Sequence, residues 1–288
     1  MKSILLWLGL VLLSTAQAAP LRLLALDWAA AETAQALGVT PVGMAQLTDY
    51  RIWSGGMPMP DSVVNVGLRM EPNLELIARL KPDLILIAPI QQGLQPLLQR
   101  IAPVRVIEFN SYQQPDSYRQ AQAATRQLAI WLDRQAEAEM LISRTGATLD
   151  ALANQLGEDA PPLYLFRFAD RRHLWLLGEH SLFGGALASV GIPVIPQPRS
   201  NLWGFTSVPL TALTGRAQAQ LVYIEPLPFK DMNEMQDNQL WRQLPAVRAG
   251  RVIALPAVWL GNGLPSVERF ASLLSHHWRS MEAGNGRE

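Results

Sequence analysis

Residues 116–156 read DSYRQAQAATRQLAIWLDRQAEAEMLISRTGATLDALANQL, and this stretch decides how the chain is organised. Hydrophobic side chains recur in it at steps of three and four residues, the spacing that places them on one face of a helix. The stretch contains no proline and one glycine, Gly146. It therefore predicts one long amphipathic helix, or two nearly continuous helices, over residues 116–157. Unbroken, such a helix spans roughly 60 Å, long enough to cross from one domain to another.

The segments on either side of this helix show similar patterns of short helices followed by buried strands. In the first half the pattern covers residues 72–89 and 96–109, and in the second half it covers residues 209–226 and 240–255. Such alternation is typical of an α/β fold with a mostly parallel sheet. We therefore predict an α/β protein with two lobes, residues 19–115 and 158–288, that are joined by the long helix and have a ligand cleft between them.

The N-terminus has the parts of a secretory signal peptide. Lys2 is followed by an apolar run over residues 4–13, and Ala16-Gln17-Ala18 supplies a cleavage site of small residues. The apolar run is shorter than the roughly 20 residues that a membrane span needs. There is no cysteine, which excludes disulfides and a lipid-modified N-terminal cysteine. We expect removal of residues 1–18 and a mature protein that is soluble in the periplasm.

The composition argues against nucleic-acid binding and offers no positive sign of catalysis. Lys and Arg together number 24, and so do Asp and Glu, so no net charge would attract nucleic acid. The chain lacks the sequence motifs of serine hydrolases, P-loop proteins, dinucleotide-binding proteins and zinc proteases. Its four histidines have no spacing typical of a metal site. The sequence therefore favours a binding protein without a cofactor or a resident metal over an enzyme.

The tryptophans are the most informative side chains. Trp28 and Trp259 each follow a predicted strand, while Trp53 and Trp203 lie in irregular segments, Trp53 within the Gly/Pro-rich residues 49–69. Ligands of α/β sheets bind beyond the carboxyl ends of the strands. These four residues are therefore expected to line the cleft, although any one of them could instead cover the core of its own lobe. Of the remaining tryptophans of the mature chain, Trp131, Trp241 and Trp278 lie in helical patterns and are interpreted as packing residues, and Trp175 is interpreted as a core residue of its strand.

Arg69 ends the long irregular stretch, just before a helix. A guanidinium group there would offer a planar set of donors to anionic oxygens. The alternative is a surface arginine that pairs with Glu71 or with solvent. An aromatic cleft with one cationic donor suits a bulky, partly apolar ligand whose charge is concentrated on oxygen atoms.

Several of these segments carry a resemblance to a known family. They read NVGLRMEPNLEL (residues 65–76), KPD (81–83), DYRIW (49–53), NLWG (201–204), VRAGR (247–251) and PAVW (256–259). Together they resemble the ferric hydroxamate siderophore-binding proteins of ABC importers, over essentially the whole mature chain. The resemblance implies two lobes that hold a ferric complex in a shallow cleft. It also implies an inner-membrane permease and its ATPase as partners, with the iron held by the siderophore and not by the protein.

The resemblance also assigns roles to individual residues. Arg69 is expected to donate hydrogen bonds to the hydroxamate oxygens, the four tryptophans to pack on the carbon skeleton of the siderophore, and Asn201 to make a polar contact. Where the family carries a tyrosine beside the arginine, this chain has Gln91, which we expect to contact the ligand as well. Pro196 and Phe205 also depart from the family pattern, so the pocket is expected to differ in shape.

Other ligands and another class of protein stay open at this point. Cobalamin, haem or a ferric catecholate could occupy a similar cleft, although a catecholate complex would favour more basic residues than Arg51 and Arg69. A periplasmic hydrolase that processes siderophores would need a nucleophile and a base, and no spacing in the sequence places such a pair. The binding protein is expected to be a monomer.

Overall fold

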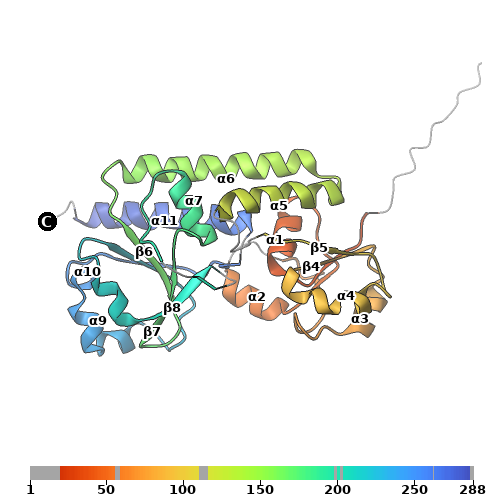
Figure 1. The fold of residues 1–288 in the computed structure, drawn as a ribbon, viewed down its shortest axis with the longest axis horizontal. Coiled ribbons are helices and arrows are strands. Elements are labelled where there is room, and N and C mark those ends of the chain that lie inside the picture. The colour runs from red at the N-terminus through yellow and green to blue at the C-terminus, as the bar shows by residue number, and fades with distance from the viewer. Residues whose placement is uncertain are drawn as a thin grey trace, which may run out of the picture.

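The structure is a computed structural model that describes residues 20–55, 59–109, 116–197, 200–201, 204–261 and 263–285. The expected signal peptide lies outside the described residues, and so does Trp203. The described chain forms two α/β lobes at opposite ends of an elongated molecule (Figure 1). The predicted fold class is confirmed.

The first lobe is built on a sheet in which all five strands are parallel, in the order β3-β2-β1-β4-β5. Its strands are β1 (Leu23–Ala25), β2 (Gly43–Met44), β3 (Val64–Asn65), β4 (Leu84–Ile87) and β5 (Val104–Val106). Its helices are α1 (Trp28–Ala36), α2 (Leu47–Ser54), α3 (Leu74–Leu80), the 3-10 helix η1 (Pro89–Leu94) and α4 (Gln95–Leu98).

The ends of these helices follow from local sequence. The Asp27 carboxylate accepts from the Ala30 N–H at 3.0 Å at the start of α1, and the Asn73 side chain does the same for the Leu76 N–H at 2.9 Å in α3. Helix α2 ends at Gly55, which has a φ of 47°. The prediction that residues 49–69 are irregular is therefore wrong for residues 49–54, because the glycines and prolines mark the end of a helix there.

The second lobe has a mixed sheet in the order β10-β9-β6-β7-β8. Its strands are β6 (Leu163–Phe168), β7 (His173–Leu177), β8 (Phe205–Pro209), β9 (Gln220–Ile224) and β10 (Val252–Leu255). Its helices are α7 (Leu182–Ser189), η2 (Leu210–Thr214), α8 (Asn233–Gln236), α9 (Gln239–Gln243), α10 (Pro245–Arg248) and α11 (Leu264–Asn285). The parallel series β6-β9-β10 repeats the series β1-β4-β5, as the two sequence patterns indicate, while β7 and β8 add an antiparallel extension.

The connection between the lobes consists of two helices, α5 (Ser117–Leu132) and α6 (Gln135–Leu156). Asp133 adopts a left-handed conformation with a φ of 54°, and α6 turns back to lie beside α5 (Figure 1). A salt bridge between Arg126 and Glu139, at 2.7 Å, joins the two antiparallel helices. A continuous 60 Å helix is therefore wrong. Two helices are present, as the other alternative predicts, but α6 runs back beside α5 and does not continue it, and α5 itself contacts α1 of the first lobe and α7 of the second.

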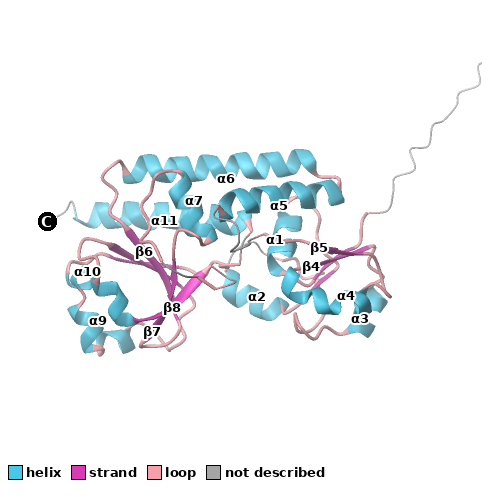
Figure 2. Ribbon diagram, in the orientation of Figure 1, coloured by secondary structure: helices cyan, strands magenta, loops and turns pink. Residues whose placement is uncertain are grey.

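Helices α5, α6 and α11 form a layer along one side of both sheets (Figure 2). The largest hydrophobic cluster joins the two lobes through this layer, because it includes Leu86 of β4, Leu165 of β6, Leu128 of α5, Leu149 of α6 and Phe270 of α11. A shared core of this kind resists large movements of one lobe against the other. Within the described part of the chain, no helix has both the length and the hydropathy needed to cross a membrane.

Candidate functional site

A cleft of about 410 Å³ opens between the lobes. The first lobe supplies polar and aromatic side chains to it, and the second lobe supplies mainly aromatic ones. The lining residues are Trp28, Gln46, Asp49, Trp53, Arg69, Arg167, Trp175, Phe205, Trp259, Leu260 and Gly261. The described lining therefore combines an aromatic wall with two guanidinium groups and one carboxylate.

Trp28 and Trp259 form the aromatic contact between the lobes. Trp28 is the first residue of α1, directly beyond β1, and Trp259 lies beyond the end of β10. Their ring centroids are 4.5 Å apart, with the planes inclined at 65°. Trp28 is 2 % exposed and its Nε1 donates to the Ala45 carbonyl at 2.8 Å, so its ring is fixed in place. Both residues lie where the sequence predicts them.

Gly261 makes the position of Trp259 possible. A Cβ atom at residue 261 would lie 2.2 Å from the Trp259 Nε1, so only glycine allows the indole to fold over this turn. The Trp259 Nε1 is buried and has no hydrogen-bond partner among the described residues.

Arg69 reaches over the tryptophan pair. Its Cζ lies 4.3 Å from the centroid of the Trp28 ring and 5.6 Å from that of Trp259, distances at which a cation and an aromatic face attract each other. Its Nε donates to the Gln46 Oε1 at 2.9 Å. Burial lowers the pKa of the Arg69 guanidinium, and the carboxylates of Asp27 and Asp49 oppose that shift. Arg69 is thus a positioned cation in the cleft and not a surface arginine paired with Glu71.

The structure places Gln91 behind the wall of the cleft and not in its lining. The side chain is 2 % exposed, and its amide donates to the main-chain oxygens of Arg69 at 2.9 Å and Leu26 at 3.3 Å. Its carbonyl oxygen accepts from the Ala88 N–H at 2.9 Å. Gln91 therefore holds the main chain that carries Arg69, an indirect role that the sequence did not indicate.

Trp53 faces a residue that sequence reasoning missed. It lies in the last turn of α2, and its ring centroid is 4.9 Å from the Cζ of Arg167 in the opposite lobe. Arg167 is 1 % exposed, yet it belongs to the buried strand LYLFRF. The available signal was an arginine within an otherwise apolar strand, because an arginine side chain is almost never fully buried unless it has a partner.

Trp175 and Phe205 form the other aromatic face of the second lobe. Their rings stack with centroids 4.9 Å apart and planes inclined at 23°. The interpretation of Trp175 as a core residue is wrong: it is half-buried and lines the cleft. Alternation along β7 would have shown this, since buried Leu174 and Leu176 point to the opposite face. Phe205 departs from the family pattern, and for that reason the pocket is expected to differ in shape. Its side chain lines the cleft.

Asn201 shapes the segment before β8 and does not line the cleft. Its side-chain oxygen accepts from the Phe205 N–H at 3.3 Å, and its main-chain N–H donates to the Phe205 carbonyl at 2.9 Å. These bonds join Asn201 to Phe205 at the start of β8. The predicted contacts of Asn201 and Trp203 with a ligand stay predictions, Trp203 because it lies outside the described residues.

A buried acid lies where three helices of the two lobes meet. Glu32 of α1 is 2 % exposed and accepts from the Ser266 Oγ of α11 at 2.7 Å and from the Tyr50 hydroxyl of α2 at 3.4 Å. Burial, helped by the nearby Asp27 carboxylate, raises the pKa of Glu32 to about 8. The protonated acid therefore links the first lobe to α11 at neutral pH.

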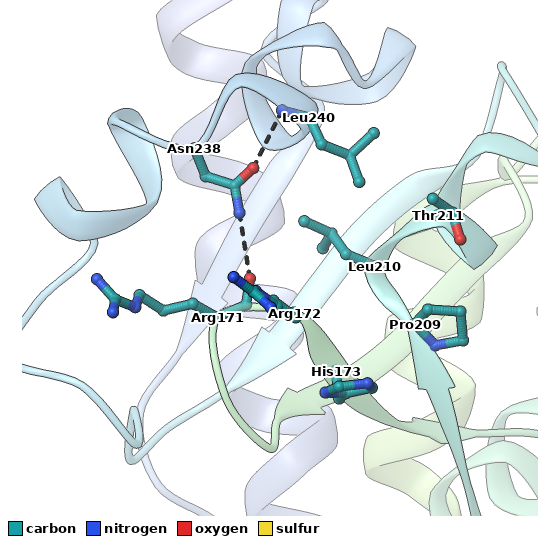
Figure 3. Close-up of a pocket in the computed structure, with 8 residues that line it drawn as sticks. All are labelled: Arg171, Arg172, His173, Pro209, Leu210, Thr211, Asn238 and Leu240. Carbon is teal, nitrogen blue, oxygen red and sulfur yellow. Dashed lines mark hydrogen bonds between the residues drawn. The ribbon is translucent and has the colours of Figure 1, made fainter.

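A second cavity, of about 500 Å³, lies wholly within the second lobe (Figure 3). Its walls come from the turn between β6 and β7 with the start of β7, from the end of β8 with the start of η2, and from α9. No tryptophan or phenylalanine is among its described lining residues. The Asn238 side chain joins two of these walls, because its amide donates to the Arg171 carbonyl and its oxygen accepts from the Leu240 N–H (Figure 3).

The described residues offer no cluster of metal ligands. No three His, Cys, Asp or Glu side chains among them lie close enough together to hold a metal ion.

Comparison with known proteins places the chain in a family. The sequence model described as periplasmic binding protein matches residues 23–258. The chain belongs to the periplasmic binding protein family. The resemblance drawn from the sequence motifs is thereby confirmed at the level of the family.

Individual relatives of this periplasmic binding protein cover nearly its whole length. The iron(3+)-hydroxamate-binding protein FhuD of Escherichia coli (strain K12) is 34% identical over 268 residues, which cover 92% of this chain and 90% of the relative. The achromobactin-binding periplasmic protein of Dickeya dadantii (strain 3937) is 28% identical over 265 residues, with 85% of this chain and 79% of the relative covered. Both are binding proteins by name.

A solved structure supports the same grouping. The siderophore-binding protein FhuD from Vibrio cholerae, crystallised with Fe3+-Desferal bound, superimposes with a TM-score of 0.82 at 32% sequence identity. The match covers 90% of this periplasmic binding protein and 98% of the solved chain. The two-lobed fold is therefore shared with a homologous siderophore-binding protein.

Proposed function

We propose that the chain binds a ferric siderophore of the hydroxamate or mixed hydroxamate–carboxylate type in the cleft between its lobes. The observation that carries the proposal is Arg69, which lines the cleft and lies against Trp28 and Trp259. The guanidinium supplies donors for the oxygens around the iron, and the aromatic rings supply apolar surface for the carbon skeleton. The relative of E. coli and the solved relative of V. cholerae, named for hydroxamate and Desferal complexes, support this ligand class.

The charge of the cleft favours a hydroxamate over a ferric catecholate. Its described lining holds two arginines, Arg69 and Arg167, and one carboxylate, Asp49. Tris-catecholate complexes of iron carry several negative charges and would require more cations around them. The aromatic lining alone would suit haem or cobalamin, and the named relatives do not point to either.

The same proposal extends to the role of the protein in the cell. After removal of residues 1–18 the mature chain would be soluble in the periplasm, with residues 19–115 and 158–288 as its lobes and residues 116–157 as the connection. It would act as a monomer that delivers the loaded siderophore to an inner-membrane ABC permease and its ATPase. The protein would be a carrier without a cofactor of its own, and the iron would stay on the siderophore.

The test is calorimetric titration of the mature protein with ferrichrome, a ferric hydroxamate, in comparison with the Arg69→Ala variant. We expect Arg69→Ala to weaken binding by roughly 10- to 100-fold, since it removes hydrogen bonds from a charged donor. Arg51→Ala is the matched control, because Arg51 is an exposed arginine that pairs with Asp61 at 3.0 Å outside the cleft. Equal affinity in the wild-type protein and Arg69→Ala would remove Arg69 from the site.

A further inference from the structure

Arg167 is a buried cation to which the proposed function assigns no contact with the ligand. It lies near the carboxyl end of β6, where the parallel strands β6, β9 and β10 point toward the cleft, and it is 1 % exposed. A buried charge normally has an ionic partner. No described carboxylate lies within 4.0 Å of its guanidinium.

The guanidinium is fixed by main-chain oxygens instead. Its Nη2 donates to the carbonyls of Glu225 at 2.7 Å and Val258 at 3.0 Å, and its Nε donates to the Ile224 carbonyl at 3.3 Å. The Nη1 makes no hydrogen bond to any residue that the structure describes. The group is therefore rigidly held while one donor nitrogen is left for a further acceptor.

Arg69 differs from Arg167 in the charge around it. Two carboxylates, those of Asp27 and Asp49, act on Arg69 and offset its positive charge. Burial alone lowers the pKa of Arg167, to about 10, so that it is still charged at neutral pH and its charge is not offset. Among the described lining residues, Arg167 thus carries the positive charge that no carboxylate offsets.

The two arginines also reach across the cleft in opposite directions. Arg69, from the first lobe, lies 5.6 Å from the ring of Trp259 in the second lobe. Arg167, from the second lobe, lies 4.9 Å from the ring of Trp53 in the first lobe. Each guanidinium therefore faces the space between the lobes against an aromatic ring of the other lobe, which is where a ligand of the proposed class would lie.

We propose that Arg167 contacts the ligand from the second lobe and selects ferric complexes that carry a negative charge, such as mixed hydroxamate–carboxylate complexes, over neutral or cationic hydroxamate complexes. An anionic oxygen at Nη1 would complete its hydrogen bonds and offset its charge in a site of low dielectric. This inference rests on the proposed function and narrows it to a charge class of ligand.

The test uses three ferric complexes with one iron-binding core. Ferric desferrioxamine B carries one positive charge on its free amine, the N-acetyl derivative carries no net charge, and the N-succinyl derivative carries one negative charge. Titration of the wild-type protein should give affinities that rise in that order, with the anionic complex bound about tenfold or more tightly than the neutral one, as one charge-assisted hydrogen bond provides. Equal affinities, or the tightest binding for the cation, would overturn the inference.

Variants assign the discrimination to Arg167. In Arg167→Gln the preference for the anionic complex over the neutral one should fall to about threefold or less, while Arg167→Lys, which keeps the charge, should retain more of it. Arg172→Gln is the matched control, since it removes the same charge from the wall of the second cavity of the same lobe (Figure 3). An unchanged preference in a folded Arg167→Gln protein would refute the assignment.

The outcomes separate this inference from the proposed function. Binding of all three complexes without charge preference contradicts only the role of Arg167. Failure of the wild-type protein to bind any of the three contradicts the proposed ligand class itself, and the inference with it. If Arg167→Gln does not fold, as circular dichroism would show, the wild-type series and Arg167→Lys still decide the question.

Discussion

Replacement of Glu32 by glutamine should change how the stability of the protein depends on pH. The Glu32 carboxyl group is buried between α1, α2 and α11, where it accepts from the Ser266 Oγ at 2.7 Å. A glutamine side chain in its place would have nearly the same shape and could accept from Ser266 and donate to the Tyr50 hydroxyl. The substitution therefore removes the titration while it keeps the packing of the junction.

The size of the effect follows from the pKa of Glu32, which burial raises from 4.5 to about 8. Below pH 4.5 the group is protonated in both the folded and the unfolded protein. Between pH 4.5 and about 8 the unfolded chain has lost this proton and the folded protein has kept it, so the free energy of unfolding falls as the pH rises. At about 1.4 kcal/mol for each tenfold change in proton affinity, the full loss is about 5 kcal/mol.

The assay is urea unfolding followed by tryptophan fluorescence at intervals from about pH 4.5 to about pH 9, for both proteins. Glu32→Gln should match the wild-type protein at the acidic end and exceed it by up to about 5 kcal/mol above pH 8. Glu158→Gln is the control: Glu158 is exposed, so its loss should change the stability by less than about 0.5 kcal/mol throughout. A constant difference between wild type and Glu32→Gln across the whole range would refute the assignment of a neutral, buried acid.

Three further substitutions test the construction of the cleft. Gly261→Ala should weaken ferrichrome binding about tenfold in a calorimetric titration, because the added Cβ would lie 2.2 Å from the Trp259 Nε1 and must displace the indole. Unchanged affinity would show that the Trp259 ring does not contact the ligand. Gln91→Ala should lower the free energy of unfolding by about 1–3 kcal/mol in urea. It should weaken ferrichrome binding less than Arg69→Ala does, because the Gln91 side chain acts through the Arg69 main chain. A larger loss of affinity than in Arg69→Ala would mean that Gln91 contacts the ligand directly. Trp131→Phe should leave the affinity unchanged, because Trp131 lies on α5 against Arg105, and a large loss would contradict its role in packing.

The cleft could be predicted from the sequence where simple rules of α/β sheets apply. Trp28 and Trp259 follow strands that are recognisable from their runs of apolar residues, and ligands bind beyond the carboxyl ends of such strands. The structure places both residues there, 4.5 Å apart. Arg69 was found through its position before a helix and through the family motif around it.

The residues that were missed depend on features that a single sequence does not reveal. Arg167 reaches the cleft because β6 pairs with β9 in a register that sets its side chain beside the Ile224 and Glu225 carbonyls. Gln91 supports Arg69 indirectly, because its side-chain amide donates to the main-chain oxygen of Arg69. This is a tertiary contact between residues 22 positions apart. Neither register nor tertiary packing can be read from hydrophobic periodicity.

The reversal between α5 and α6 had a weak signal in the sequence. The hydrophobic pattern continues through residues 133 and 134 without proline or glycine, so it predicts a continuous or nearly continuous helix. Asp133 makes the turn, because aspartate adopts the left-handed conformation more readily than most residues. The turn is stabilised by packing of α5 against α6 and of α6 against α11, which only the folded protein provides.

Titration of the mature protein with a panel of ferric ligands tests the central claim most directly. The panel holds ferrichrome, ferric desferrioxamine B, a ferric catecholate, haem and cobalamin, each metal-free siderophore serving as a control, and binding is followed by tryptophan fluorescence and confirmed by calorimetry. The account predicts saturable binding of ferric hydroxamates at about micromolar concentrations or below, with much weaker binding of the other ligands and of metal-free hydroxamates. Tight binding of the catecholate, haem or cobalamin without binding of any hydroxamate would contradict it.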